Sequence, residues 1–114
     1  MTDYRMLIGG KLVDAGEHME VVNPATGEAF AAVPRASAAD ADAAIVAARA
    51  AQPAWAARPI AERRAAIVAL ADAIAANGDE LARLLTMEQG KPLAEAKGEI
   101  AWTEGYLRHY ATLE

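Results

Sequence analysis

The sequence predicts two N-terminal β-hairpins followed by an Ala-rich bundle of three to four helices. Short apolar runs joined by glycine-containing turns occupy residues 1–35, whereas alanine dominates residues 36–114 and proline or glycine interrupts it at intervals. Glycine accepts the positive φ of a tight hairpin turn, and alanine is the best helix former. We therefore expect a β-hairpin region at residues 1–35 and a helical region at residues 36–114.

Each predicted hairpin consists of two apolar runs separated by turn residues. In the first hairpin, Gly9-Gly10 separates residues 4–8 from residues 11–13. In the second, the Asn-Pro-Ala-Thr-Gly turn at residues 23–27 precedes the apolar run at residues 29–33. Two hairpins of this size bury too little apolar surface to be stable alone, so we expect them to lie on other structure.

The first predicted helix begins at a capping box. Ser37 and Asp40, three residues apart, match that motif with Asp in place of the usual Glu or Gln. The helical pattern runs through Ala51, and we expect Pro53 to end it because the residue before a proline disfavours helical geometry. Pro59 is suited to the first turn of the next helix.

The remaining helix boundaries are marked by glycine and proline. Asn77-Gly78 predicts a break, and the acidic pair that follows it favours a new helix N-terminus. Gly90-Lys91-Pro92 predicts the end of that helix, because glycine suits a C-cap and proline cannot continue a helix. Leu93 then begins a last helix. We expect it to run to the end of the chain without a cap or a basic last turn.

The last predicted helix carries apolar residues on two sides. The first stripe is Leu93, Ala96, Ile100, Leu107 and Ala111, and the second is Trp102, Tyr106, His109 and Leu113. The preceding elements can cover only one stripe, so we expect the partner of the other to lie in a continuation of the chain, another chain or an oligomer. The alternative is an exposed terminal helix that dimerises.

The composition limits the function classes. The chain has 16 acidic and 11 basic residues without a basic stripe, so nucleic acid is not an expected partner. No run of about 18 uncharged apolar residues exists, and the start lacks the features of a secretory signal, so we expect a cytoplasmic protein without a membrane partner. The absence of cysteine excludes disulfides, thiolate metal ligands and a thiol nucleophile.

Motifs that would indicate an active site are missing. Gly90-Lys91 fails as a phosphate loop because Leu85 stands where a glycine is required and Pro92 where a hydroxyl is required. No Gly-x-Gly-x-x-Gly occurs, so the sequence predicts no cofactor-binding residues. The carboxylates of Glu88, Glu95 and Glu99 are interpreted as a solvated face with weak pairing to Lys91. The residues alone therefore predict no catalytic residue.

Three motifs nevertheless resemble the start of the NAD(P)-dependent aldehyde dehydrogenase family. They read Leu-Ile-Gly-Gly-Lys at residues 7–11, Val-Asn-Pro-Ala-Thr-Gly-Glu at residues 22–28 and Glu-Gln-Gly-Lys-Pro-Leu-Ala-Glu-Ala at residues 88–96. The third is most similar to the succinate-semialdehyde dehydrogenase branch. The resemblance covers essentially the whole chain and implies an α/β parent fold, in which both regions form the N-terminal part of a larger cofactor-binding domain.

The resemblance also implies what this chain lacks. Family members oxidise an aldehyde through a cysteine nucleophile and transfer hydride to NAD or NADP. Those catalytic and cofactor-contacting residues lie further along the family's chain, and none maps here. We expect this chain to be an N-terminal fragment that is inactive alone. Its parent is expected to be a cytoplasmic oligomer, whose partners are the aldehyde, the remainder of the enzyme or further copies.

Two groups of site residues follow from the resemblance. In some members a monovalent cation is held by a backbone oxygen before the Asn-Pro turn, here Val21 or Val22, and by an acidic side chain, here Glu88. The helix after Gly-Lys-Pro lines the mouth of the substrate tunnel in the family, which points Trp102, and after it Gly98 and Tyr106, at the aldehyde. Two alternatives remain: a stand-alone small helical interaction or dimerisation module, and a split enzyme completed by a second polypeptide.

Overall fold

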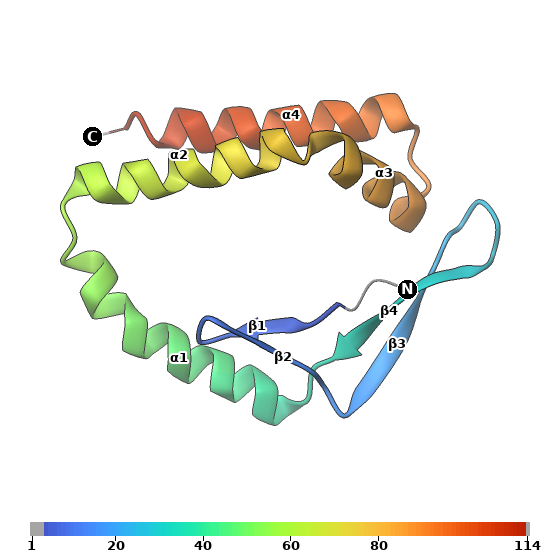
Figure 1. Cartoon of the computed structure of the whole chain (residues 1–114), viewed down its shortest axis with the longest axis horizontal. Coiled ribbons are helices and arrows are strands. Elements are labelled where there is room, and N and C mark those ends of the chain that lie inside the picture. Colours follow the sequence, from blue (N-terminus) through green and yellow to red (C-terminus); the bar gives the residue numbers. More distant parts are fainter. Residues whose placement is uncertain (1–3, 114) are drawn as a thin grey trace. The chain divides into compact units, whose positions relative to one another are not determined.

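The computed structural model describes residues 4–113, which form four strands followed by four helices (Figure 1). The predicted order of two hairpins and then helices is confirmed. The chain divides into two compact units, Met1–Ala57 and Arg58–Glu114. The elements in chain order are β1 (Met6–Ile8), β2 (Lys11–Val13), β3 (Glu17–Val22), β4 (Ala29–Arg35), α1 (Ala38–Ala56), α2 (Ile60–Ala76), α3 (Gly78–Gln89) and α4 (Leu93–Tyr110).

The first hairpin of the first unit is formed by antiparallel β1 and β2. Ile8 pairs with Lys11, and Gly9 and Gly10 between them have φ angles of 59° and 76°. Two consecutive positive φ angles characterise the hairpin turn whose twist matches that of the strands. A Cβ added to Gly9 would lie 3.6 Å from the Cβ of Ala47 on α1, so the turn contacts that helix.

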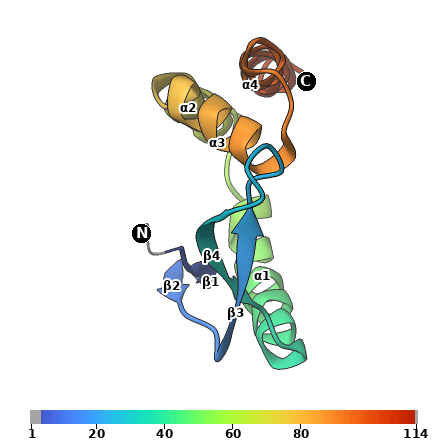
Figure 2. The ribbon, with the colours of Figure 1, turned by 90° about the vertical axis from the view of Figure 1, so that its right-hand side faces the viewer.

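The second hairpin pairs β3 with β4 through the predicted Asn-Pro turn. The amide of Asn23 donates to the carbonyl of Glu28 at 2.9 Å, and the amide of Gly27 donates to the carbonyl of Asn23 at 2.8 Å. The register shifts between Val21 and Val22, so the regular ladder is interrupted just before the turn. Figure 2 shows this hairpin as a twisted ribbon that extends beyond its paired strands into the turn.

Helix α1 begins at the predicted capping box but ends later than expected. Ser37 Oγ accepts from the Asp40 amide at 3.2 Å, and the Asp40 carboxylate accepts from the Ser37 amide at 2.8 Å. Pro53 lies inside α1, so the prediction that it ends the helix is wrong. Proline removes one backbone donor but keeps a helical φ, and the Ala57 amide still donates to the Pro53 carbonyl at 3.0 Å.

The second unit has a core made of alanine. Helix α4 runs beside both α2 and α3 (Figure 1), and Ala71, Ala82 and Ala96 on the three helices have no exposed surface. A side chain of one methyl group lets helix axes approach closely. Among the described residues no side chain larger than alanine is fully buried.

The breaks between these helices agree with the sequence. Asn77 separates α2 from α3, and its Nδ2 donates to the carbonyl of Ala73 at 2.8 Å. Gly90 caps the end of α3 in the left-handed region with a φ of 76°, and its amide donates to the carbonyl of Thr86 at 2.8 Å. Pro92 directly precedes α4, as predicted.

The end of α4 differs from the prediction. The helix stops at Tyr110, before the end of the chain, and its last turn contains the basic residues Arg108 and His109. The hydroxyl of Thr112 donates to the carbonyl of His109 at 2.7 Å, which satisfies one of the carbonyls that a helix end leaves free. The expectation of a last turn without basic residues is therefore wrong, whereas the helix ends, as expected, without a glycine or a left-handed residue, since its C-cap is Ala111.

The last strand ends at Arg35 and the first helix begins at Ala38, near the predicted boundary between the two regions. The compact units divide the chain elsewhere, because α1 belongs to the same unit as the hairpins. The assignment of both regions to a larger cofactor-binding domain stays a prediction. Among the described residues, no helix combines the length and the apolar character needed to cross a membrane.

Candidate functional site

Helix α4 has one covered and one uncovered apolar face. On the first stripe Ala96 and Ala111 are buried, Ile100 and Leu107 are half-buried, and Leu93 at the start of the helix is 42% exposed. On the second stripe the side chains of Trp102 and Tyr106 are 73% and 58% exposed, and those of His109 and Leu113 are also exposed. The expectation that the preceding elements cover only one stripe is confirmed.

The uncovered face contains a shallow hollow of about 290 Å³. The rings of Trp102 and Tyr106 meet edge to face, with centroids 6.3 Å apart. The lining is mainly apolar and consists of Ala101, Trp102, Gly105, Tyr106 and His109. This open hollow on one helix can form part of the wall of a binding site.

The structure brings together two of the three predicted substrate residues. Trp102 and Tyr106 line the hollow, whereas Gly98 lies one helical turn before Trp102 and is not part of the lining. A Cβ added to Gly98 or Gly105 would meet nothing within 4 Å. Sequence reasoning missed Gly105, although its spacing of three residues from Trp102 places it on the same face.

The basic side chains near α4 form ion pairs. Lys91 contacts Glu99, and Lys97 Nζ lies 2.7 Å from Oδ1 of Asp79. Lys91 does not pair with Glu95, the partner four residues away, because it precedes the helix and reaches further along it. The hydrogen bond from Lys97, followed by its charge, lowers the pKa of Asp79.

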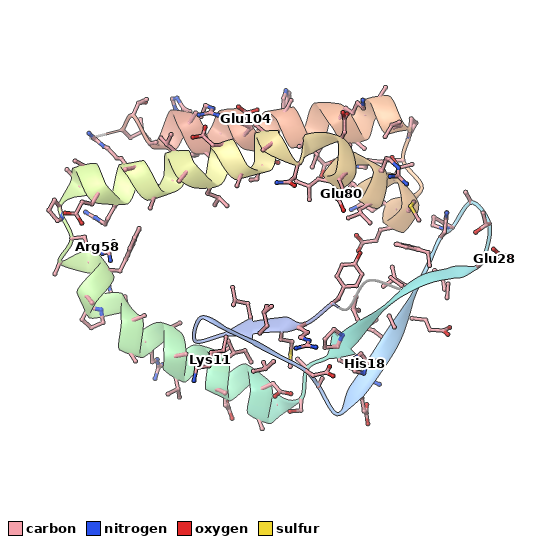
Figure 3. All side chains as sticks on the ribbon, in the orientation of Figure 1. Lys11, His18, Glu28, Arg58, Glu80 and Glu104 are labelled. Atoms are coloured by element: carbon pink, nitrogen blue, oxygen red, sulfur yellow. The ribbon has the colours of Figure 1, made fainter. Side chains whose placement is uncertain are left out.

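Arg108 joins α4 to α2. Its Nη2 donates to Oδ1 of Asp72 at 2.7 Å, and its Nε donates to Oε1 of Glu104 at 2.9 Å. The hydrogen bonds to Asp72 and Glu104 raise the pKa of the Arg108 guanidinium. Glu104 lies on α4, as labelled in Figure 3. The Arg108 guanidinium therefore connects α4 to α2 through its hydrogen bond to Asp72.

The two predicted cation ligands belong to different units. Val22 ends β3 beside the register shift, and Glu88 is an exposed residue in the last turn of α3. A backbone carbonyl and a carboxylate are hard oxygen donors that suit a hard cation. Two donors make only part of a coordination shell. The described residues contain no group of three or more His, Asp or Glu side chains that could hold a metal ion.

The described residues do not fit the phosphates of a dinucleotide. Such phosphates bind at helix N-termini through free backbone amides. At α1 the Asp40 carboxylate already accepts from the Ser37 amide, and the first turns of α2 and α4 contain the acidic residues Glu62 and Glu95. Helix α3 begins with Asp79 and Glu80, which repel an anion. The acidic groups at these helix starts disfavour a dinucleotide phosphate there.

Two side-chain types common in catalysis, cysteine and histidine, can be checked directly. The sequence contains no cysteine, and His18, labelled in Figure 3, pairs with an aspartate, its Nε2 lying 2.9 Å from Oδ1 of Asp14. Both members of that pair are substantially exposed. What the described residues offer is an apolar wall on α4.

Comparison with known proteins places this wall in context. The sequence pattern described as "Aldehyde dehydrogenase family" matches residues 12–114. The chain is 46% identical to the glutarate-semialdehyde dehydrogenase of Pseudomonas putida over 106 residues, which are 91% of this chain and 22% of that protein. It is 44% identical to the succinate-semialdehyde dehydrogenase [NADP(+)] of Escherichia coli over 107 residues, 92% of this chain and 22% of that protein.

Solved structures give the same picture. A 3,6-anhydro-L-galactose dehydrogenase in complex with NAP superposes with a TM-score of 0.91 at 35% identity, over 95% of this chain and 23% of that chain. The succinate-semialdehyde dehydrogenase of Burkholderia pseudomallei superposes with a TM-score of 0.88 at 45% identity, over 96% of this chain and 23% of that chain. The chain thus spans less than a quarter of the length of these relatives.

Proposed function

Because the chain belongs to the aldehyde dehydrogenase family, we propose that it serves as the N-terminal segment of an enzyme that oxidises an aldehyde to a carboxylic acid with NAD or NADP. The family match over residues 12–114, together with coverage of only 22% of the relatives' length, carries this proposal. The complete enzyme is proposed to be cytoplasmic and oligomeric. Glutarate and succinate semialdehyde, named in the relatives, are the first substrates to test.

The role of this segment is to bind and orient the aldehyde. We propose that Trp102, Tyr106 and Gly98 face the substrate, a role supported by the exposed apolar hollow on α4. The cofactor would be held by the rest of the enzyme and would supply the hydride-accepting chemistry. A bulky apolar wall excludes water and restricts how the aldehyde tail lies, and such positioning lowers the entropic part of the barrier.

A monovalent cation is proposed to bind where this segment meets the rest of the enzyme. The backbone oxygen of Val22 or Val21 and the carboxylate of Glu88 would be two of its ligands. The interrupted ladder at Val21 and Val22 supports this proposal, because a register shift turns backbone groups away from regular pairing. The isolated chain is proposed to be inactive, since it has no thiol nucleophile.

A chimera tests the function directly. Residues 1–114 replace the matching region of the Pseudomonas putida glutarate-semialdehyde dehydrogenase, and reduction of NAD and NADP is followed with glutarate semialdehyde. We expect turnover by the chimera and none by the isolated chain or by the truncated relative. A folded but inactive chimera contradicts the proposal. A chimera that does not fold also contradicts it, because a segment with this role has to be accepted by a relative's body.

A second candidate function is a small helical interaction or dimerisation module. The exposed aromatic face of α4 favours it, because such faces mark contact surfaces. Light scattering of the isolated chain at several concentrations distinguishes the two. The module is supported if the isolated chain forms a dimer, if Tyr106→Ala dissociates that dimer, and if the chimera is inactive. A monomer at all concentrations would remove it.

A further inference from the structure

The junction between α2 and α3 is a single asparagine that precedes a glycine. Asn77 lies between the last residue of α2, Ala76, and the first residue of α3, Gly78, and it has a φ of −110° and a ψ of 14°. Its side chain is exposed and lines a hollow of about 290 Å³ between the two helices. Solvent therefore reaches a junction for which the proposed function has no use.

An exposed asparagine before glycine can react with its own main chain. Asparagine is among the thermolabile residues. The backbone nitrogen of the next residue attacks Cγ and forms a C–N bond, while the bond from Cγ to Nδ2 breaks and ammonia leaves with the proton of that backbone nitrogen. Water then opens the cyclic succinimide at either carbonyl, which gives aspartate or its β-linked isomer. Glycine favours the attack, because no Cβ restricts rotation beside the nitrogen.

The sequence confines this reaction to one of its two asparagines. Asn23 precedes Pro24, whose backbone nitrogen carries no hydrogen and cannot form the succinimide. Gln89 also precedes a glycine, but its side chain is one carbon longer and closes a larger ring more slowly. The chain therefore contains its own controls for the chemistry at Asn77.

The folded junction slows the reaction without preventing it. A ψ of 14° turns the Gly78 nitrogen away from Cγ, so the Asn77 backbone has to rotate before the ring can close. Asn77 Nδ2 donates to the Ala73 carbonyl at 2.8 Å, and the Leu81 amide donates to the Asn77 carbonyl at 3.0 Å. These bonds oppose the rotation, but they lie at an exposed residue between two helices, where local opening costs less than global unfolding.

We propose that Asn77 is a site of spontaneous modification, at which the side-chain amide is converted to a carboxylate, in part with a β-linked main chain. The conversion makes the formal net charge of −5 one unit more negative. The β-linked isomer also adds one atom to the main chain just before α3. That atom displaces Asp79, whose Oδ1 lies 2.7 Å from Nζ of Lys97, so the modification weakens the contact of α3 with α4.

The test follows both asparagines in the 114-residue chain during incubation at neutral pH. Trypsin releases residues 65–83, which contain Asn77, and residues 12–35, which contain Asn23. Chromatography with mass spectrometry measures the conversion of amide to acid in each peptide, and a sample taken before incubation corrects for conversion during the digest. The Asn77→Asp variant identifies the α-linked product. We expect both isomers at residue 77, no conversion at Asn23, and faster conversion of Asn77 in concentrated urea.

Gly78→Ala is the matched control variant. Its added Cβ would lie 3.8 Å from Cγ2 of Ile100, which is an ordinary contact, so the variant should fold, as circular dichroism can verify. It should slow the conversion by about fivefold or more, because the Cβ restricts rotation beside the attacking nitrogen. Equal rates in the two folded chains would overturn the proposal, and so would conversion of Asn23 at the rate of Asn77. An intact Asn77 in the folded chain, at a time when the chain in urea is fully converted, would overturn it as well.

Discussion

Arg108 and Asp72, 36 residues apart in the sequence, are joined by a hydrogen bond of 2.7 Å between Nη2 and Oδ1. The contact fixes the last turns of α4 against α2, where the only fully buried side chain of α2 is that of Ala71. A charge-assisted hydrogen bond adds direction to an interface that is otherwise made of methyl groups. It therefore has a larger part in setting the helix register than it would in a thicker core.

Removal of this hydrogen bond should loosen α4. We expect Arg108→Met to lower the Tm of the isolated chain by a few degrees at low salt. The difference from the unsubstituted chain should shrink at about 1 M NaCl, because the lost interaction is electrostatic and partly exposed. Circular dichroism melts measure both effects. Arg83→Met, at an exposed arginine of α3, is the control and should leave the Tm unchanged.

The capping box of α1 predicts that the stability of the fold depends on pH in the acidic range. Hydrogen bonds from the Ser37 hydroxyl and then from its amide lower the pKa of Asp40 from the ordinary value of 3.8. A carboxyl with a lowered folded-state pKa stabilises the fold fully above its unfolded-state pKa, and this contribution is lost as pH falls through the folded-state value. Stability should therefore fall below about pH 4, and less steeply in Asp40→Asn. Chemical unfolding across this range, followed by circular dichroism, measures the slope; equal slopes would contradict the assignment.

The alanine contact between α3 and α4 should not accept a larger side chain. Ala96 has no exposed surface, so we expect Ala96→Leu to lower the free energy of unfolding by about 1–3 kcal/mol through overpacking. Ala94→Leu, two residues earlier and exposed, is the matched control and should have little effect. Urea titrations of both variants test the difference. A neutral Ala96→Leu would mean that the helices are more loosely packed than the structure describes.

Glycine at position 98 should lower the stability of α4 but leave space for the substrate. In the isolated chain, Gly98→Ala should raise the free energy of unfolding by about 0.5–1 kcal/mol, because alanine is the better helix residue and its Cβ meets nothing within 4 Å. In the chimera the same methyl group should narrow the space beside Trp102 and lower kcat/KM. Urea unfolding and steady-state kinetics give the two readings. Unchanged kinetics would remove Gly98 from the proposed substrate residues.

The cation proposal predicts a salt-specific effect on activity. Potassium or sodium, compared with choline at equal ionic strength, should raise the activity of the chimera. Glu88→Gln should raise the cation concentration needed for half of the effect by about tenfold or more, because the charged ligand is lost. Glu80→Gln, at the other end of α3, is the control (Figure 3). An identical cation response in the two variants would exclude Glu88 as a ligand.

Local features of the fold were predictable because their signals lie within a few residues. Gly9, Gly10 and Gly90 mark turns and caps that require positive φ, and the structure has positive φ at all three. The two stripes of α4 follow from helical periodicity alone. Pro53 does not end α1, which continues for three further residues: proline's own φ is helical, and its cost is confined to one lost backbone hydrogen bond and crowding at the carbonyl four residues earlier.

Contacts between distant residues were not predictable in the same way. Lys97 pairs with Asp79 and Arg108 with Asp72 because packing of α4 on α2 and α3 brings them together. Nothing in the spacing of those residues indicates a pair, since helical periodicity relates only neighbours three or four apart. The hollow beside Trp102 was partly predictable, because the aromatic stripe indicated the face but not the opening at Gly105.

The buried alanines have a calorimetric consequence. The buried apolar side chains of the described residues are all alanines, and the larger apolar side chains are only half-buried or exposed, so melting hydrates little additional apolar area. The heat-capacity change on unfolding grows with the apolar area that becomes hydrated. The isolated chain should therefore melt with a small heat-capacity step and a shallow stability curve. Burial of the aromatic face of α4 against the rest of an enzyme would enlarge that heat-capacity step. Calorimetry can therefore detect the association of this segment with a partner.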